Sequence, residues 1–419
     1  MRTSVQEGPR AATGTATGTA VVTGIAVAAP NGLGTEEYWA AVCAGRSGLG
    51  RITRFDADQY PARLAGEIKG FVPGEHLSSR MLPQTDHMTR LNLVVGDWAF
   101  ADAGVTPADW PDFHIGIMTA SSAGGYEFGE RELRNMWSKG GQYVSAYQSF
   151  AWFYAVNCGQ LSIRNGTRGP GGVVVGDQAG GLDALGQARR QIRKGTPMML
   201  SGAVDSSLCS WGWAAELASG RLSTVEDPER AYLPFDAAAG GHVPGEGGAI
   251  LVLEDAGSAR ERGARVYGEI AGYASTFDPR PGSGRPPGLR RAMEAALADA
   301  GVSPADVQVV FADAAALPGL DAVEATAIRE VFGRDAVPVT APKTMTGRLN
   351  AGAGPLDVAT ALLSIRDSLI PGTAGVTVNP GLGIDLVVGG SRAAEVTTAL
   401  VVARGHGGFN SAVVVRATR

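Results

Sequence analysis

Residues 171–185, GGVVVGDQAGGLDAL, constrain the fold of this chain more than any other stretch. A short valine run bounded by glycines is typical of a buried strand, and the apolar pattern after Gly180 and Gly181 continues as a helix. A tight strand-to-helix turn exposes one side chain in a cavity, beside backbone N–H groups that stabilise negative charge. Enzymes use this geometry to present a nucleophile, but the residue at the tip here is Gln178.

Gln178 leaves two interpretations open. A carboxamide does not titrate and is a poor nucleophile, so a site built for covalent catalysis would be inactive with glutamine at this position. Alternatively, Gln178 only satisfies the polar groups of a buried turn. The stretch alone predicts the strand, the turn and the helix, and does not decide what the turn is for.

The rest of the chain predicts an α/β protein with a large packed interior. Its 419 residues exceed one ordinary domain, and 44% of them are apolar. The 60 glycines are scattered among apolar runs, which indicates many tight turns rather than a collagen-like repeat. Strand and helix patterns alternate in both halves, which favours mixed sheets covered by helices. Strands are predicted at 20–25, 115–119, 198–204, 249–253, 267–273, 307–312, 337–340, 400–403 and 412–416, and helices at 35–45, 86–104, 126–137, 150–163, 287–300, 321–333 and 355–370.

Composition also excludes several classes of function. The net charge of −5 argues against nucleic acid as a main partner. The three cysteines are widely spaced, and the five histidines never fall at metal-ligand spacing, so we expect neither a disulfide framework nor a metal site. No apolar run approaches the roughly 18 residues of a membrane span, and no signal peptide is evident. We therefore expect a cytoplasmic protein that does not enter the membrane.

The order of several motifs resembles the ketosynthase branch of the thiolase superfamily, over residues 19–417. Gln178 stands where that family has its nucleophilic cysteine. Residues 234–236 (PFD) and 244–248 (PGEGG) match the family, and residues 405–408 (GHGG) stand for its GFGG loop, with His406 in place of a phenylalanine that gates the acyl site. The resemblance implies a thiolase-like fold in which two similar halves form five layers, α-β-α-β-α. We expect a disordered tail at 1–18, an N-terminal half at 19–255 and a C-terminal half at 256–419.

Both catalytic histidines of the family are replaced in this chain. Asp321 and Glu324 match the acids of HGTGTxxxDxxE, whose histidine position falls on Asp313. Lys343 begins a KxxxGH motif whose histidine position falls on Arg348. Condensation needs a thiolate and two imidazoles, so the resemblance implies a chain that does not condense. Lys343 is either a retained cation of the site, in contact with Asp313 or Glu324, or part of a structural ion pair.

One subfamily matches closely, namely the chain-length factors (ketosynthase β subunits) of bacterial type II polyketide synthases. Residues 175–184 reproduce its glutamine context, and residues 119–125 (TASSAGG), 149–156 (SFAWFYAV) and 211–213 (WGW) also look like it. The resemblance implies a heterodimer with a catalytic ketosynthase α subunit. An acyl carrier protein would deliver chains on its own phosphopantetheine, so this chain itself is expected to bind no cofactor.

The resemblance also implies that part of this chain limits the product. Tyr126, Gly129 and Leu133 share one helix face, which in the family closes the end of the polyketide tunnel. Trp211 and Gly212 are further tunnel candidates, although a tryptophan at this spacing is more often core. Glycine inside a helix costs about 1 kcal/mol relative to alanine, which favours a need for space and a product longer than an octaketide, most simply a decaketide. The alternative is that Gly129 only permits close helix packing.

Two other functions remain open at this stage. The chain could be a decarboxylase of malonyl-acyl carrier protein that primes synthesis, or a thiolase-like acyltransferase, using Gln178, Asp313 and Lys343. The amide of Gln178 could donate to an oxyanion without covalent work. Alternatively, the chain could be a chain-length factor of a reduced polyene system.

Overall fold

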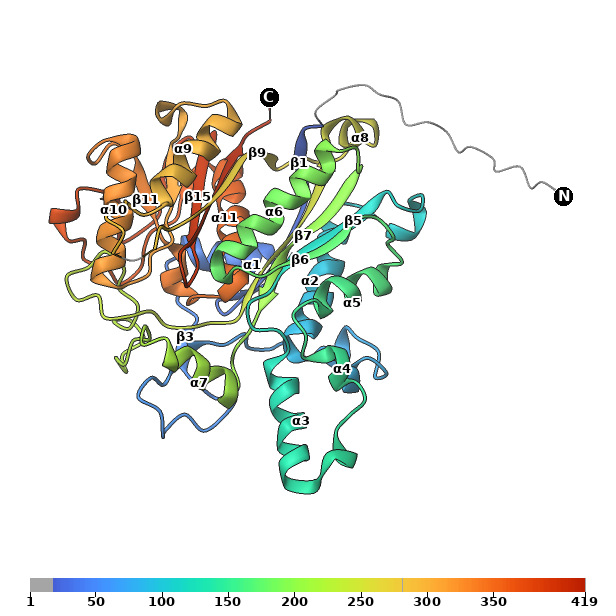
Figure 1. The fold of residues 1–419 in the computed structure, drawn as a ribbon. Coiled ribbons are helices and arrows are strands. Elements are labelled where there is room, and N and C mark those ends of the chain that lie inside the picture. The colour runs from blue at the N-terminus through green and yellow to red at the C-terminus, as the bar shows by residue number, and fades with distance from the viewer. Residues whose placement is uncertain (1–17, 281, 419) are drawn as a thin grey trace.

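The computed structural model describes residues 18–280 and 282–418, and Figure 1 shows its ribbon. The tail predicted at 1–18 lies almost entirely outside the described residues. The predicted boundary between residues 255 and 256 stays a prediction; one strand ends at Asp255 and the next long strand begins at Gly268. Among the helices in the described part of the chain, none is long and apolar enough to cross a membrane.

The strands of the first half form a mixed sheet in the order β6-β5-β7-β8-β1, with the short β2 (Gly32–Leu33) also paired to β1. The pairing of β1 with β9 (Gly268–Phe277) joins this sheet to that of the second half in one continuous ladder of 12 described strands. β5, β6 and β7 are parallel, and β8 runs antiparallel to both β7 and β1. The long elements of this half, in chain order, are β1 (Ala20–Ala29), α1 (Thr35–Cys43), α2 (His87–Asp102), β5 (Ile115–Ala120), α3 (Tyr126–Lys139), α5 (Val156–Asn165), β6 (Gly171–Val174), α6 (Asp177–Arg193), β7 (Met198–Asp205), α7 (Ser210–Ala218) and β8 (Gly247–Asp255).

The second half repeats this arrangement. Its strands follow the order β13-β11-β10-β15-β16-β9. Apart from the short edge strand β13, each strand has the same place as its counterpart in the first half. The elements are α8 (Ala256–Glu261), β9 (Gly268–Phe277), α9 (Leu289–Ala300), β10 (Val309–Phe311), α10 (Pro318–Phe332), β11 (Pro338–Thr340), α11 (Ala353–Asp367), β15 (Thr398–Arg404) and β16 (Phe409–Arg416). Shorter strands are β2 (Gly32–Leu33), β3 (Leu49–Arg51), β4 (Leu64–Gly66), β12 (Leu369–Ile370), β13 (Asp385–Leu386) and β14 (Arg392–Ala393).

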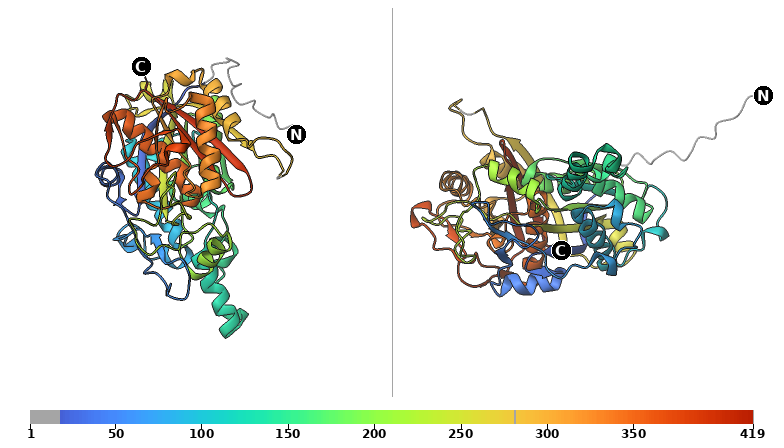
Figure 2. Two further views of the ribbon diagram at one scale, coloured as in Figure 1. Left: turned by 90° about the vertical axis from the view of Figure 1, so that its left-hand side faces the viewer. Right: turned by 90° about the horizontal axis from the view of Figure 1, so that it is seen from below.

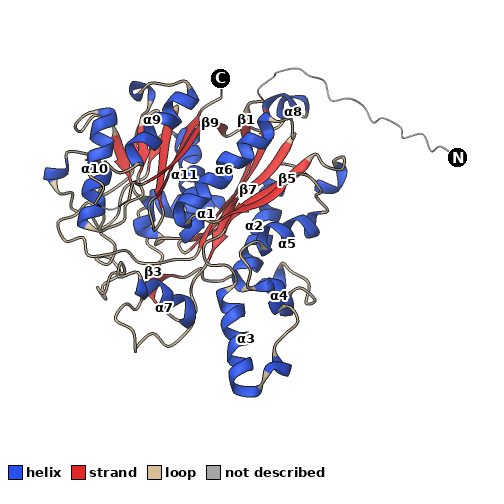
Figure 3. Ribbon diagram, in the orientation of Figure 1, coloured by secondary structure: helices blue, strands red, loops and turns tan. Residues whose placement is uncertain are grey.

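Three buried clusters show that these elements form five layers, as predicted. The middle cluster packs α6 and α11 between the two sheets, and the outer clusters pack α2 and α5 on the first sheet and α9 and α10 on the second. Alternate strand residues face opposite layers: in β16, Val413 and Val415 belong to the middle cluster, whereas Ala412 and Val414 belong to an outer one. Figures 2 and 3 show the layered helices and strands.

The two sheets meet where β1 pairs with β9, through Val21 opposite Glu269 and Val22 opposite Gly268. In the middle layer, Gly181 of α6 lies against the Ala351 carbonyl and the Pro355 ring at the start of α11, where no side chain would fit. This close approach of the two helix N-termini places the glutamine turn of the first half beside the loop that carries Arg348.

One predicted feature of the first half is wrong, and one helix was missed. The helix predicted at 150–163 is two helices, α4 (Gln148–Ala151) and α5. At the break, the N–H of Val156 donates to the Phe153 carbonyl at 3.0 Å, and the Trp152 carbonyl accepts instead from the N–H of Gly125 at 3.0 Å. Helix α7 was not predicted. In Figure 1, α3 and the segment after it project from the lower end of the first half.

Candidate functional site

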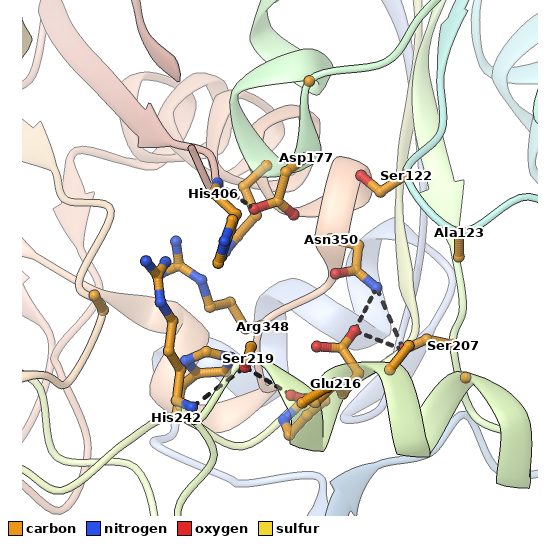
Figure 4. A pocket seen from close by; sticks show the side chains of 18 of the residues that line it. Ser122, Ala123, Asp177, Ser207, Glu216, Ser219, His242, Arg348, Asn350 and His406 are labelled. Carbon is orange, nitrogen blue, oxygen red and sulfur yellow. Dashed lines mark hydrogen bonds between the residues drawn. The ribbon is translucent and has the colours of Figure 1, made fainter. Parts of the chain in front are cut away.

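The turn at the start of α6 presents Gln178 as expected. Asp177 has a φ of 51°, a left-handed conformation that few residues other than glycine adopt. Its carboxylate accepts the N–H of His406 at 2.8 Å, which ties the turn to the loop between β15 and β16 (Figure 4). Gln178 follows at the N-terminal end of the helix, only 2% exposed, and lines a cavity of about 630 Å³. We call this the Gln178 cavity.

Arg348 is hydrogen-bonded to the side-chain amide of Gln178. With the amide oriented so that its oxygen faces the guanidinium, as the hydrogen-bond network requires, that oxygen accepts from Nε and, at 2.6 Å, from Nη2 of Arg348. The position that holds a nucleophile in a condensing enzyme is therefore the acceptor of a charge-assisted hydrogen bond.

The same arginine is paired with Asp313. Nη2 donates to the two carboxylate oxygens at 2.9 and 3.0 Å, and Nη1 donates to the Asp313 carbonyl at 2.9 Å. Burial disfavours the charge of Arg348, but the Asp313 carboxylate outweighs burial and raises the pKa of the guanidinium above its usual value. Gln178, Arg348 and Asp313 thus form one connected group at the three positions expected from the sequence.

The two acids, Asp321 and Glu324, accept hydrogen bonds from backbone N–H groups. Glu324 accepts the N–H groups of Asp313 at 2.6 Å and Ala314 at 2.9 Å, and Asp321 accepts the N–H of Phe235 at 2.8 Å. Burial, followed by the charge of Asp313, raises the pKa of Glu324 to about 7, and burial raises that of Asp321 to about 6. These carboxyls position the Asp313 loop.

Lys343 has a different partner from the two considered from the sequence. Its ammonium lies 2.7 Å from the carboxylate of Asp357 on α11 and also donates to the Ala312 carbonyl. Both side chains of the pair are at most 5% exposed. Contact with Asp313 or Glu324 is therefore wrong, and the alternative of a structural ion pair describes Lys343.

Several polar residues of the Gln178 cavity were missed by sequence reasoning, among them Ser207, Glu216, His242 and Asn350. Glu216 accepts the hydroxyl of Ser207 at 2.9 Å and the amide of Asn350 at 3.2 Å (Figure 4). Burial, and then the charges of Arg348 and Arg221, hold the pKa of His242 well below its usual value, so the imidazole is neutral. Glu216 lies on the unpredicted helix α7, and no local signal marked any of the four.

The predicted tunnel residues fall on two hollows. Tyr126 and Gly212 line the Gln178 cavity. Leu133 and Trp211 line a second hollow of about 800 Å³ along α3, which we call the α3 groove. The remaining lining of this groove is Glu130, Arg134, Trp137, Ser138 and Ser210.

Gly129 opens no empty space. It is buried, and a Cβ atom there would lie 2.9 Å from Cζ3 of Trp211. The indole of Trp211 fills the room that the glycine leaves, which is the close-packing alternative raised from the sequence. Any limit on product length at this face therefore involves Trp211 together with Gly129.

The cavity has the frame of a condensing site but not its reactive groups. Among the described residues that line it, none is a cysteine, and its only imidazoles are His242 and His406. An acyl thioester cannot form on Gln178, and Arg348 cannot exchange protons near neutral pH.

Comparison with known proteins agrees with this geometry. Residues 19–259 match the family model for the beta-ketoacyl synthase N-terminal domain, and residues 267–377 match the model for its C-terminal domain. The chain is 60% identical to the actinorhodin polyketide beta-ketoacyl synthase 2 of Streptomyces coelicolor, over 94% of this chain and 98% of that protein. It is also 60% identical to the tetracenomycin polyketide synthase ketoacyl synthase beta subunit of Streptomyces glaucescens, with the same coverage.

Two solved structures share the whole fold. The ishigamide ketosynthase/chain length factor is 26% identical with a TM-score of 0.87, over 96% of this chain and 100% of that one. A type II polyketide synthase acyl-carrier protein in complex with its ketosynthase bound to the hexaketide has 26% identity and a TM-score of 0.85, with the same coverage. The fold and the site define a ketosynthase-like protein without the condensing residues. The chain belongs to the beta-ketoacyl synthase family, among the ketosynthase β subunits of type II polyketide synthases.

Proposed function

We propose that this chain is a chain-length factor, the non-condensing subunit that pairs with a catalytic ketosynthase α subunit in a minimal type II polyketide synthase. One observation carries the proposal. Gln178, Arg348 and Asp313 hold the places of the cysteine and the two histidines and are bonded to one another, so the site is occupied by a buried polar group with no nucleophile. Bond formation then belongs to the partner, and this chain shapes the product.

An exposed aromatic surface supports a protein partner. Six aromatic side chains between the end of α3 and the start of α5 are each at least 39% exposed: Trp137, Tyr143, Tyr147, Trp152, Phe153 and Tyr154. α5 follows this segment and packs on β6, which forms the edge of its sheet and pairs with β5 alone among the described strands. Large exposed apolar patches and unpaired strand edges mark interaction sites. We assign this aromatic surface and the β6 edge to the α subunit.

The second partner is an acyl carrier protein, which would supply the phosphopantetheine arm. The solved ketosynthase in complex with its acyl-carrier protein supports this assignment. A cytoplasmic location fits the three free cysteines, because disulfides are rare in reducing compartments.

Co-expression tests the proposed function directly. The chain purified alone is expected to form no carbon–carbon bond and to carry no acyl group when given malonyl-acyl carrier protein. The chain together with an α subunit is expected to yield polyketides whose masses give the chain length. An acyl group found on the isolated chain by mass spectrometry would contradict the proposal, and the α subunit with its own cysteine replaced serves as the control.

Replacing Gly129 by leucine is expected to shorten the polyketide made by the complex. The new side chain meets the indole of Trp211 and pushes it into the α3 groove, so less room is left for the chain. Product masses of the wild-type complex and the Gly129→Leu complex test this, with Gly129→Ala as the smaller change. Products of unchanged length from an assembled Gly129→Leu complex would contradict it. That the native product exceeds an octaketide stays a prediction for the same measurement.

A further inference from the structure

One pair of aromatic rings lies between the two hollows. The ring of Tyr126, from the start of α3, stacks on the indole of Trp211, from α7, with centroids 5.1 Å apart and planes inclined by 29°. Tyr126 lines the Gln178 cavity, and Trp211 lines the α3 groove. The stacked pair therefore has one ring in the lining of each hollow.

Two glycines allow the rings to stack. Gly129 leaves room for the edge of the indole, as described above. At Gly212, a Cβ atom would overlap the Ser207 carbonyl oxygen and lie 2.9 Å from Cδ2 of Tyr126, so a side chain there would collide with the backbone and with the phenol ring. The position of the pair is therefore determined by how closely α3 approaches α7.

Glu130 of α3 connects these two helices. One carboxylate oxygen accepts the hydroxyl of Ser210 at 2.5 Å, and the other accepts the backbone N–H of Trp211 at 3.0 Å. The first N–H groups of a helix have no partner within it, so the carboxylate caps α7 from a neighbouring helix and lies at the positive end of its dipole. Partial burial opposes ionisation, but the hydrogen bonds from Ser210 and Trp211 outweigh it and hold the pKa of Glu130 below its usual value.

The carboxylate of Glu130 is therefore hydrogen-bonded to the backbone of Trp211, the residue whose indole lies between the two hollows. Arg134, one turn further along α3, completes the group with bonds to Glu130 at 2.6 Å and to Ser210 at 3.0 Å. Glu127 lies one turn before Glu130 on α3 and is exposed. Its carboxylate lies 3.9 Å from the guanidinium of Arg54 and makes no hydrogen bond to the described residues of α7. Only one of these two neighbouring glutamates therefore connects to Trp211.

We propose that Glu130 is a positioning residue that holds the Tyr126–Trp211 pair between the α3 groove and the Gln178 cavity, and so sets where a growing polyketide stops. The inference rests on the proposed function. With Glu130 intact, a chain entering the groove from the partner subunit ends against the indole. Without the carboxylate, the Ser210 hydroxyl and the Trp211 N–H lose their acceptor, the indole moves, and the cavity of about 630 Å³ becomes available to the chain.

The test measures product masses from the complex of this chain with an α subunit and an acyl carrier protein. Trp211→Ala is expected to raise the ratio of longer to native-length products by about tenfold or more, because the separation is removed. Glu130→Gln is expected to move the ratio in the same direction by about threefold to tenfold, because its single amide oxygen can replace only one of the two acceptor oxygens and carries no charge. The double variant is expected to match Trp211→Ala, because both changes act on one indole. Glu127→Gln is the matched control and should leave the distribution unchanged.

Each outcome decides one question. The inference is overturned if Glu130→Gln gives the native product distribution, or if the double variant lengthens the product beyond Trp211→Ala. In either case, a longer product from Trp211→Ala alone still supports the proposed function. If Trp211→Ala and Gly129→Leu change the yield but never the length, the proposed function itself fails. Should Glu130→Gln prevent assembly, Ser210→Ala removes one of the two bonds to the carboxylate, and products of native length from that variant overturn the inference.

Discussion

Replacing Arg348 by leucine is expected to destabilise this chain by about 3–5 kcal/mol, because it leaves the Asp313 carboxylate buried and unpaired. The two side chains are only 10% and 2% exposed, so water cannot replace the lost partner. Gln178 loses its donor in the same step. Denaturant unfolding of the purified complex is the measurement, and the expected result is a clear fall in the midpoint.

A double replacement of Arg348 and Asp313 tests whether the loss of stability comes from the unpaired charge or from the changed shape of the side chain. Arg348→Met combined with Asp313→Asn removes both charges and keeps an acceptor for the Arg404 N–H, which Asp313 bonds at 2.8 Å. Since a buried ion pair contributes little net stability over neutral groups of similar size, the double variant is expected to recover part of the loss. If the double variant unfolds as early as Arg348→Leu, the ion pair is not the cause.

Replacing Phe153 by glutamate is expected to weaken binding to the α subunit by about 30-fold or more, the effect of losing a central aromatic residue at an interface. Phe153 lies in the middle of the aromatic surface, 4.3 Å between ring centroids from Tyr154 and 6.1 Å from Trp152. A carboxylate there would lose its water on binding with no cation to compensate it, since the surface around it is aromatic.

Titration of the α subunit against the purified chain, or the yield of co-purified complex, gives the affinity. Phe277→Glu is the matched control, because Phe277 is a 56% exposed aromatic on β9 of the other half, outside the aromatic surface. Equal loss of binding from both variants would show that the aromatic surface is not the specific contact, and retained binding with Phe153→Glu would remove it from the interface.

Local patterns in the sequence were sufficient for most of the fold. Continuous apolar runs mark the long strands, such as β1, β7 and β15, because both faces of the sheet are covered by helices. Apolar residues at helical spacing mark α2 and α9, and in α9 the buried side chains lie on one face. The break between α4 and α5 could not be predicted this way. The Trp152 carbonyl at the break accepts a hydrogen bond from Gly125, which is distant in the sequence.

The sequence by itself determined what three positions of the site cannot do, because chemistry depends on residue identity. A glutamine at 178 cannot carry an acyl thioester, and an aspartate at 313 and an arginine at 348 cannot supply the two imidazoles, wherever these side chains point. Only the tertiary structure decided what these and neighbouring residues do instead. Lys343 pairs with Asp357, and the room beside Gly129 is filled by Trp211 from a helix eighty-two positions later in the chain. Such partners come from elements that meet only after folding, so periodicity and spacing carry no information about them.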